Sequence, residues 1–295
     1  MIKTTNLNGE IIDLKRELIL TDPTNYAFSS LLMKQGAKPI SSIIHTWKNE
    51  SLSTGATPTS SLTLEGADVE NFQASSRTDV YNICQIINKA VSVSETAQTV
   101  ALEGISDLFS HELALRMIEA KRELEYFLIN GVYTTESGIT PRQMKGLLEW
   151  ITGAYATETV GATPTYTEFS NMAKLMRQAG TASNDMLLLC DYNMTDYINA
   201  YFSAINQYIN VQNEFGSWVK KINFPYGSCF MYTVDAMPIN TAVMVNIRYL
   251  KLAELRSLKY YDLARTGSSR KGFIEMENTL MFKHPAAAVK LTIGS

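Results

Sequence analysis

Apolar residues recur at spacings of three and four between residues 102 and 128, which is the pattern of one long amphipathic helix. They are Leu102, Ile105, Phe109, Leu113, Met117, Ala120, Leu124 and Phe127 or Leu128. Thr99 or Ser94 could cap its start, and the Asn130-Gly131 pair supplies a stop. The pattern predicts a helix of about 30 residues, roughly 45 Å long. Because ordinary helices have about 10–14 residues, we expect this one to form the spine of its domain.

Shorter segments of both kinds flank this helix. Helical spacing predicts a short helix over residues 26–35, where Phe28, Leu31 and Leu32 share one face. It also predicts helices over 167–180 and 192–211, and the apolar run 186–190 predicts a short buried strand. From Cys229 onward, apolar runs separated by Gly, Pro and Asn predict strands at FMYTV, AVMV, FIEM, TLMF and AAVKLTI. The chain therefore belongs to the α+β class, with segregated elements.

One region is unusually rich in serine and threonine. Residues 51–63 read SLSTGATPTSSLT, and the flanking segments alternate apolar and polar residues in places, as a pair of exposed strands does. A connection this long with so little to bury is uncommon inside a compact domain. Either it is a disordered insertion, or its strands find partners on another subunit. The second is favoured because five of its residues are too apolar for a solvated linker: Ile43, Ile44, Trp47, Leu62 and Leu64.

Composition and charge narrow the class of function. The chain has 295 residues, of which 45% are hydrophobic, so it can form one large or two smaller globular domains. Its 26 basic and 29 acidic residues give a net charge of −3. That balance offers no bulk attraction to phosphate, which argues against a dedicated DNA-binding protein.

The cysteines and the apolar runs indicate the compartment. Cys84, Cys190 and Cys229 are odd in number and far apart, so neither a disulfide framework nor a zinc ribbon is expected, and a reducing compartment is favoured. Charged residues between 13 and 17 interrupt the N-terminal apolar residues, unlike in a signal peptide. No apolar run approaches the roughly 20 residues that cross a bilayer. We therefore expect a soluble protein made in a cytoplasm.

Motifs that carry chemistry are sparse. The three histidines lie in different parts of the chain, and we find no GxSxG, Walker or GxGxxG motif. Glu119, Glu123 and Glu125 alternate with basic residues, which predicts a solvated helix face with Glu112–Arg116 and Lys121–Glu125 as ion pairs. The basic stretch 265–271, RTGSSRK, either contacts phosphate or, more in keeping with its composition, forms a polar turn between strands. No catalytic residue, cofactor site or metal site is predicted, although a soluble α+β enzyme stays an alternative.

A set of motifs in a fixed order resembles the SU-10-like family of phage major capsid proteins, which have the Hong Kong 97-type fold that encapsulins share. The motifs are Tyr26-Ala27-Phe28, Trp47-Lys48-Asn49-Glu50-Ser51-Leu52, Glu65-Gly66-Ala67-Asp68, Arg77, Asn82-Ile83-Cys84-Gln85-Ile86, Val91-Ser92-Val93-Ser94, Lys145-Gly146-Leu147-Leu148 and residues 272–291. The likeness covers residues 20–150 and 270–292. Ala27 and Glu95 depart from it, since the family often has proline and glycine there.

The resemblance implies a domain organisation. Residues 1–39 would form an N-terminal arm and residues 40–93 an extended β-hairpin loop. Residues 94–145 and 241–295 would form a peripheral domain that contains the long spine helix, and residues 146–240 an α/β axial domain. The implied function is not enzymatic. It is that of a major capsid protein, which self-assembles into an icosahedral shell around the double-stranded DNA of a tailed bacteriophage; an encapsulin-type compartment is the alternative.

The resemblance also implies partners and contact residues. Six hairpin residues are expected to contact neighbouring subunits through apolar burial and charge pairs: Trp47, Lys48, Glu50, Glu65, Asp68 and Arg77. The expected partners are copies of the chain in hexameric and pentameric capsomers, with scaffold, portal and decoration proteins as further candidates. Contact with packaged DNA would be weak and non-specific at most, and neither a cofactor nor a membrane is implied. The protein would be assembled in the bacterial host cytoplasm and reside in the virion capsid.

Overall fold

The computed structural model of the chain describes residues 26–51, 64–66, 68, 75–100, 107–159, 163–206, 221–265 and 267–293. These residues form three sheets. The four-stranded sheet has the order β1 (Lys38–Pro39), β10 (Leu250–Leu263), β11 (Ser269–Phe282), β4 (Gln85–Ser94). The six-stranded sheet has the order β5 (Ala156–Thr159), β12 (Ala288–Ile293), β9 (Thr241–Val245), β6 (Met186–Cys190), β8 (Gly227–Thr233), β7 (Lys221–Phe224). The third is the antiparallel pair β2 (Ile44–Ser51) and β3 (Ser76–Ile83).

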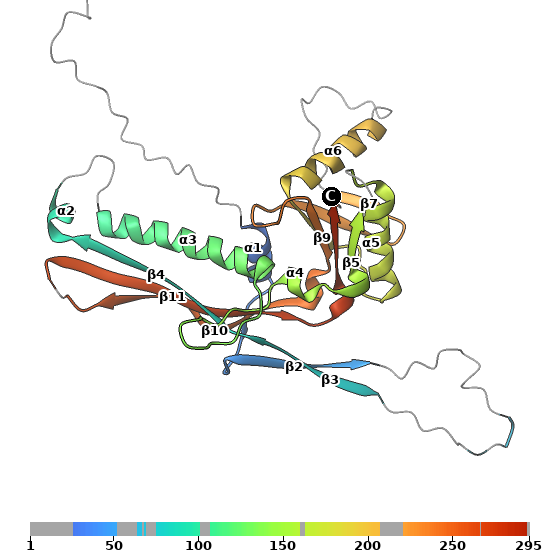
Figure 1. Cartoon of the computed structure of the whole chain (residues 1–295), viewed down its shortest axis with the longest axis horizontal. Helices are drawn as coiled ribbons and strands as arrows, with labels where there is room; N and C mark the ends of the chain where they lie inside the picture. The colour runs from blue at the N-terminus through green and yellow to red at the C-terminus, as the bar shows by residue number, and fades with distance from the viewer. Residues whose placement is uncertain are drawn as a thin grey trace, which may run out of the picture.

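A long helix, α3 (Leu108–Asn130), lies along β4 and β11 of the four-stranded sheet (Figure 1). Burial alternates along β4, because successive strand residues point to opposite faces. Ile87 on the buried face of β4 belongs to the same core as Ala120 and Leu124 of the helix. The apolar stripe seen in the sequence is therefore the surface on which α3 packs.

The long helix starts later than its apolar spacing predicts. Ser94 does act as a cap, but it caps the separate short helix α2 (Glu95–Thr99) by accepting a hydrogen bond from the Ala97 amide. Asp107 caps α3, and its carboxylate accepts hydrogen bonds from the amides of Phe109 and Ser110 at 3.0 and 3.3 Å. The helix has 23 residues rather than about 30, and residues 101–106 lie outside the described part. Its end at Asn130, before Gly131, is as predicted.

The charge of this cap gives α3 a pH-dependent contribution to stability. Hydrogen bonds from the Ser110 hydroxyl and the Gln98 amide lower the pKa of Asp107 to about 2. An unfolded aspartate titrates near pH 3.9, so the contribution is complete above about pH 4 and is lost as the pH falls toward 2. Asp107→Ala should therefore lower Tm at neutral pH, and the difference from the unaltered chain should close over that range in calorimetry. Asp107→Asn, which keeps an uncharged cap, is the control. A difference that does not vary with pH would contradict the assignment.

Two glycines allow the chain after α3 to fold back onto the helix end. A Cβ atom on Gly131 would lie 2.5 Å from the carbonyl oxygens of Phe127 and Met144. One on Gly146 would lie 2.5 Å from the Gly131 nitrogen, and the Gly146 amide donates to the Gly131 carbonyl at 2.8 Å. The two backbones touch here, which only glycine permits. Residues 131–146 thus leave and rejoin the end of α3 before α4 (Leu147–Trp150).

β6, at the centre of the six-stranded sheet, lies between two apolar cores. All five of its residues are buried, which confirms the strand predicted there. Leu187 and Leu189 join the core that contains α3 and the four-stranded sheet. Met186, Leu188 and Cys190 point the other way, into a core with residues of α5 (Tyr166–Gln178) and α6 (Tyr192–Asn206). Both helices confirm predicted segments, although the predicted end of the second, residues 207–211, lies outside the described part.

The first described helix, α1 (Ala27–Lys34), confirms the short helix predicted over residues 26–35. Its cap comes from α3, and this corrects the sequence prediction that Glu125 is solvated and paired with Lys121. The Glu125 side chain is buried, and its carboxylate accepts the amides of Phe28 and Ser29 at 2.9 and 2.6 Å. Burial raises the pKa of Glu125. The predicted pair Glu112–Arg116 is present at 3.4 Å.

The C-terminal strands mostly match their sequence pattern. The runs predicted as strands fall in β8, β9, β11 and β12, with FIEM and TLMF merged into the 14-residue β11. The stretch RTGSSRK lies between β10 and β11 and extends into the start of β11, which confirms the predicted turn; Arg265 pairs there with Glu95. The pattern missed β10 itself. None of the described helices has the length and apolarity needed to cross a membrane.

Candidate functional site

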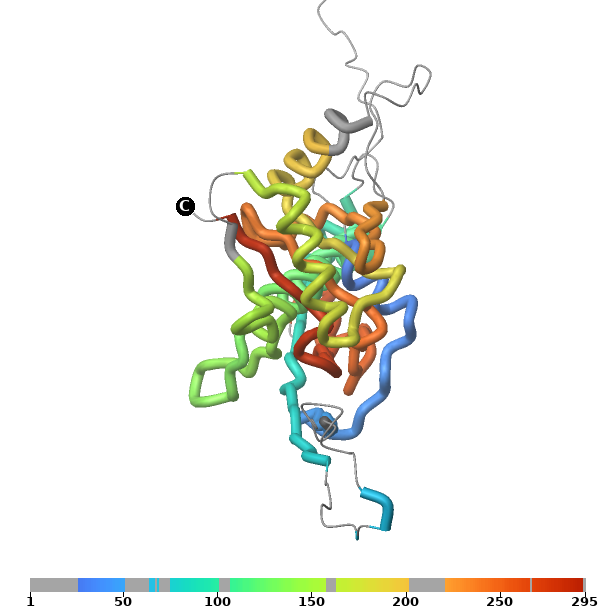
Figure 2. The backbone as a smooth tube through the Cα atoms, turned by 90° about the vertical axis from the view of Figure 1, so that its right-hand side faces the viewer, coloured from blue at the N-terminus to red at the C-terminus, as the bar shows by residue number. Residues whose placement is uncertain are grey.

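The β2–β3 pair projects from the rest of the chain in both views (Figures 1 and 2). It is antiparallel from Ile44↔Ile83 to Ser51↔Ser76, as the alternating sequence predicts, and no third strand pairs with it among the described residues. An isolated two-stranded hairpin is at best marginally stable in water. Ile43, Ile44 and Tyr81 at its base nevertheless expose large apolar side chains. The hairpin therefore presents unpaired strand edges and apolar surface to its surroundings.

The charged contact residues expected from the sequence lie on or beyond this hairpin. Lys48 faces Asp79 across the strands at 3.8 Å, and Glu50 faces Arg77 at 3.2 Å. Both pairs are exposed, so each contributes at most about 1 kcal/mol to the stability of the subunit. Glu65 and Asp68 are exposed beyond the strand ends, and Leu64 beside them is 84% exposed. Leu62 and most of the serine-rich stretch lie outside the described residues.

Trp47 occupies a different environment, in an aromatic cluster at the base of the hairpin. Only 9% of the residue is exposed. Its ring lies 5.7 Å from His45 and 5.9 Å from Trp150 of α4, and Trp150 in turn lies 6.0 Å from Phe282. Burial lowers the pKa of His45. Trp47 thus anchors the hairpin to its own chain, and its expected contact with another subunit stays a prediction.

The residue that joins the hairpin to the four-stranded sheet is Asn82, which is completely buried. Its amide nitrogen donates to the carbonyls of Lys145 and Leu280 at 3.0 and 2.8 Å. Its amide oxygen accepts the backbone amides of Ile83 and Lys145, each at 2.9 Å. All four hydrogen-bonding positions of this side chain are used. They fix the end of β3 to β11 and to the loop after α3.

A network of charges lies beside Asn82, where β3 gives way to β4. Arg142 donates to the Cys84 carbonyl at 2.8 Å and pairs with both Glu136 and Glu277. Glu277 of β11 is buried and also accepts from Arg256 of β10 at 2.9 Å. Burial raises the pKa of the Cys84 thiol to about 11, and the charge of Glu277 adds to the effect. The network clamps the hairpin root to two strands of the sheet.

The contacts of Asn82, Arg142 and Glu277 hold the β2–β3 hairpin in one direction relative to the four-stranded sheet. Within the described residues, no group of three His, Cys, Asp or Glu side chains is arranged to hold a metal ion. Sequence patterns did not single out Asn82, Arg142 or Glu277 as functional residues, because each acts through partners far away in the chain. The one available signal was the polar Asn82 inside an otherwise apolar strand end, within a motif that carried the family resemblance.

Comparison with known proteins gives a family match over almost the whole chain. The model of the family described as SU10 major capsid protein matches residues 1–293. The major capsid protein of Escherichia phage Phieco32 is 26% identical over 129 residues, which are 44% of this chain. The matched segment spans only about a third of that relative, 35% of its length.

Solved structures with the same fold include phage capsids and an encapsulin complex. The alignment with the capsid chain of cyanophage A-1(L) covers 98% of this chain and 98% of the capsid chain, with a TM-score of 0.69 and 10% identity. The capsid of cyanophage P-SCSP1u covers 100% of this chain and 93% of its own, with a TM-score of 0.63 and 11% identity. The alignment with the SrpI encapsulin of Synechococcus elongatus covers 94% of this chain and 91% of the encapsulin chain, with a TM-score of 0.58 and 11% identity. At such identities these likenesses show the fold alone.

Proposed function

Because this chain belongs to the SU10 major capsid protein family, we propose that it self-assembles into the icosahedral shell of a tailed-phage head, with the β2–β3 hairpin as the arm that links copies. The projecting hairpin with its rigid root carries this proposal. Its strand edges and its exposed residues Ile43 and Ile44 have few partners within the chain. A second copy would supply backbone hydrogen bonds and apolar burial to such an arm.

The fixed base of the hairpin lowers the free-energy cost of its binding to a neighbouring subunit. Asn82, Trp47 and the Arg142–Glu277 pair fix the base of the hairpin before any partner is present. Holding an element in its bound direction lowers the entropic cost of association. The exposed charges of Lys48, Glu50, Glu65, Asp68 and Arg77 would then select the position of the arm on a neighbour.

The two larger sheets match the proposed division into domains only in part. We assign α3, β10 and β11 to the peripheral domain, residues 94–145 and 241–295, and β5, β6, β7 and β8 to the axial domain, residues 146–240. The division crosses both sheets, because β1 and β4 of the four-stranded sheet come before the peripheral segments, and β9 and β12 of the six-stranded sheet come after residue 240. Residues 1–39 remain the N-terminal arm. The extended loop proposed for residues 40–93 is paired as a hairpin only from Ile44 to Ile83, because Gln85–Ser94 pairs with β11.

The proposed partners are copies of this chain in hexamers and pentamers. Scaffold, portal and decoration proteins are further proposed partners, and contact with the packaged DNA would be weak because the net charge is −3. Assembly would take place in the host cytoplasm. The encapsulin alternative rests on a shared fold, whereas the family match favours the phage shell.

Deleting residues 53–61, which follow β2 in the sequence and lie outside the described residues, should leave a folded subunit that no longer forms shells efficiently. We expect the concentration needed for assembly to rise about tenfold, which corresponds to a loss of about 1.4 kcal/mol of contact free energy per subunit. Light scattering of the purified chain would measure that concentration, and negative-stain electron microscopy would show the particles. Circular dichroism of the unassembled variant is the control for folding.

Two outcomes would contradict the proposal at different levels. Normal particles from the deletion variant would refute the role of the hairpin. An unaltered chain that stays monomeric at high concentration and varied salt would refute the shell function itself.

A further inference from the structure

A small turn beside the hairpin root exposes an isoleucine completely. Residues 134–143 form a narrow loop closed by backbone bridges between Thr134 and Gln143 and between Ser137 and Thr140. Gly138, with a φ of 57°, allows the tight reversal at its tip. The next residue, Ile139, has no part of its side chain buried by the rest of the chain. Polar residues and glycine are the usual occupants of such turns, so the position of this side chain requires an explanation.

Several contacts fix this turn to the rest of the subunit. Arg142 ties its second half to Glu136 at 3.1 Å, to the Cys84 carbonyl and to buried Glu277. At its base, the Tyr133 amide donates to Glu149 at 2.6 Å. A side chain mounted on a backbone that is already ordered loses little entropy when it binds.

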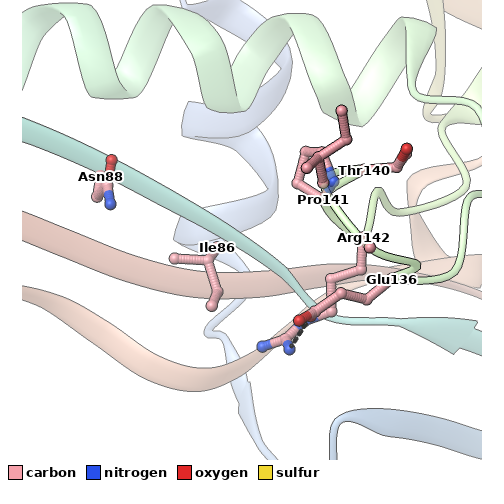
Figure 3. A pocket seen from close by; sticks show the side chains of 8 residues that line it. Ile86, Asn88, Glu136, Thr140, Pro141 and Arg142 are labelled. Atoms are coloured by element: carbon pink, nitrogen blue, oxygen red, sulfur yellow. Dashed lines mark hydrogen bonds and ion pairs between the residues drawn. The ribbon is translucent and has the colours of Figure 1, made fainter.

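A groove lies between this turn and β4 (Figure 3). Its volume is about 440 Å³, and it is lined by Ile86, Asn88, Glu136, Gly138, Ile139, Thr140, Pro141 and Arg142. Ile86 is 40% exposed, and Pro141 is exposed as well. β4 is the terminal strand of its sheet among the described residues, so its outer edge borders the groove without a strand partner there. Isoleucine and proline side chains thus flank a hollow next to an open strand edge.

We propose that Ile139 and this groove form a second contact surface between copies of this chain, separate from the β2–β3 arm. The inference rests on the proposed shell function. In a closed shell each subunit is surrounded by copies of itself through heterologous contacts. An isolated exposed isoleucine is ordinary, but one on a rigid tip beside a partly apolar groove has the features of an interface anchor. Ile139 is the side chain that a second copy buries.

The first test compares two substitutions at the same position. Ile139→Ser removes the apolar side chain, whereas Ile139→Val keeps most of it. Because Ile139 is fully exposed in the subunit, both variants should keep the Tm of the unaltered chain. Burial of an isoleucine corresponds to about a tenfold or larger change in the concentration needed for assembly. Light scattering should show this rise for Ile139→Ser and little change for Ile139→Val.

The second test asks what Ile139 contacts. A photoreactive diazirine side chain at position 139 should give covalent dimers when purified particles are irradiated, and none from unassembled subunits at the same concentration. Normal assembly of the Ile139→Ser variant, or assembled particles of the diazirine variant that give no dimers, would overturn this inference while leaving the shell function intact. Failure of the unaltered chain to assemble would instead overturn the proposed function.

Discussion

Replacing Asn82 by alanine is expected to lower the free energy of unfolding of the subunit by about 3–5 kcal/mol. The side chain makes four hydrogen bonds in a site that excludes water. Its removal leaves up to four backbone groups, on Ile83, Lys145 and Leu280, without a partner. Each unsatisfied buried group costs about 1–3 kcal/mol, reduced where the site relaxes. Chemical denaturation of the unassembled subunit measures the loss.

Asn88→Ala is the matched control for this prediction. Asn88 lies on β4, the next strand along the chain, and is exposed. Its replacement should therefore change the free energy of unfolding by less than about 0.5 kcal/mol. Equal effects of the two substitutions would refute the role of Asn82 at the root. Asn82→Ala should also reduce assembly beyond the effect on folding, because the arm is no longer held in one direction.

Glu277→Gln is expected to cost about 3 kcal/mol, the second large effect. The carboxylate is buried and pairs with both Arg142 and Arg256. The amide has nearly the same shape but carries no charge, so the largely buried Arg142 loses its buried counter-ion and keeps only the exposed Glu136. Arg256 is exposed and still pairs with Glu275, so the cost falls mainly on Arg142. Removing one partner of a buried pair is costly because the remaining charge stays desolvated. Denaturant titration of the variant checks the value.

The exposed pair between Glu50 and Arg77 provides the comparison. Glu50→Gln removes the same kind of glutamate–arginine contact from a solvated site, where such a pair contributes at most about 1 kcal/mol. The two substitutions should therefore differ strongly in stability. If Glu277→Gln were as mild as Glu50→Gln, the clamp at the hairpin root would not be a stabilising element.

The predictability of the fold varied with the range of the interactions that decide it. The end of α3 and the buried strand β6 were predicted because local periodicity and composition determine them. The start of α3 was predicted too early, since apolar spacing continues back to Leu102 while the cap at Asp107 sets the first turn. β10 was missed because its sequence, LKLAELRSLKYYDL, is rich in helix formers. Pairing with β11 along its length overrides that local preference.

The candidate site shows the same division. The strand pair of the hairpin follows from alternating residues, and the sequence located it. Its root does not follow, because Asn82 finds Leu280 across 198 residues and Arg142 finds Glu277 across 135. Glu125 was placed on the wet face by its charged neighbours, whereas the amides of α1 that it caps lie nearly 100 residues earlier. Pairings over such separations arise only from the folded topology.

The position of β6 has a consequence for the curvature of a shell. Its side chains alternate between two cores, Leu187 and Leu189 on one side and Met186, Leu188 and Cys190 on the other. A hinge between the two larger sheets would have to open one of these close-packed cores, which costs several kcal/mol for even a small cavity. We therefore expect the two sheets to move together as one rigid body. In the proposed shell, differences in local bending between pentamers and hexamers would then be absorbed by the hairpin and other peripheral segments.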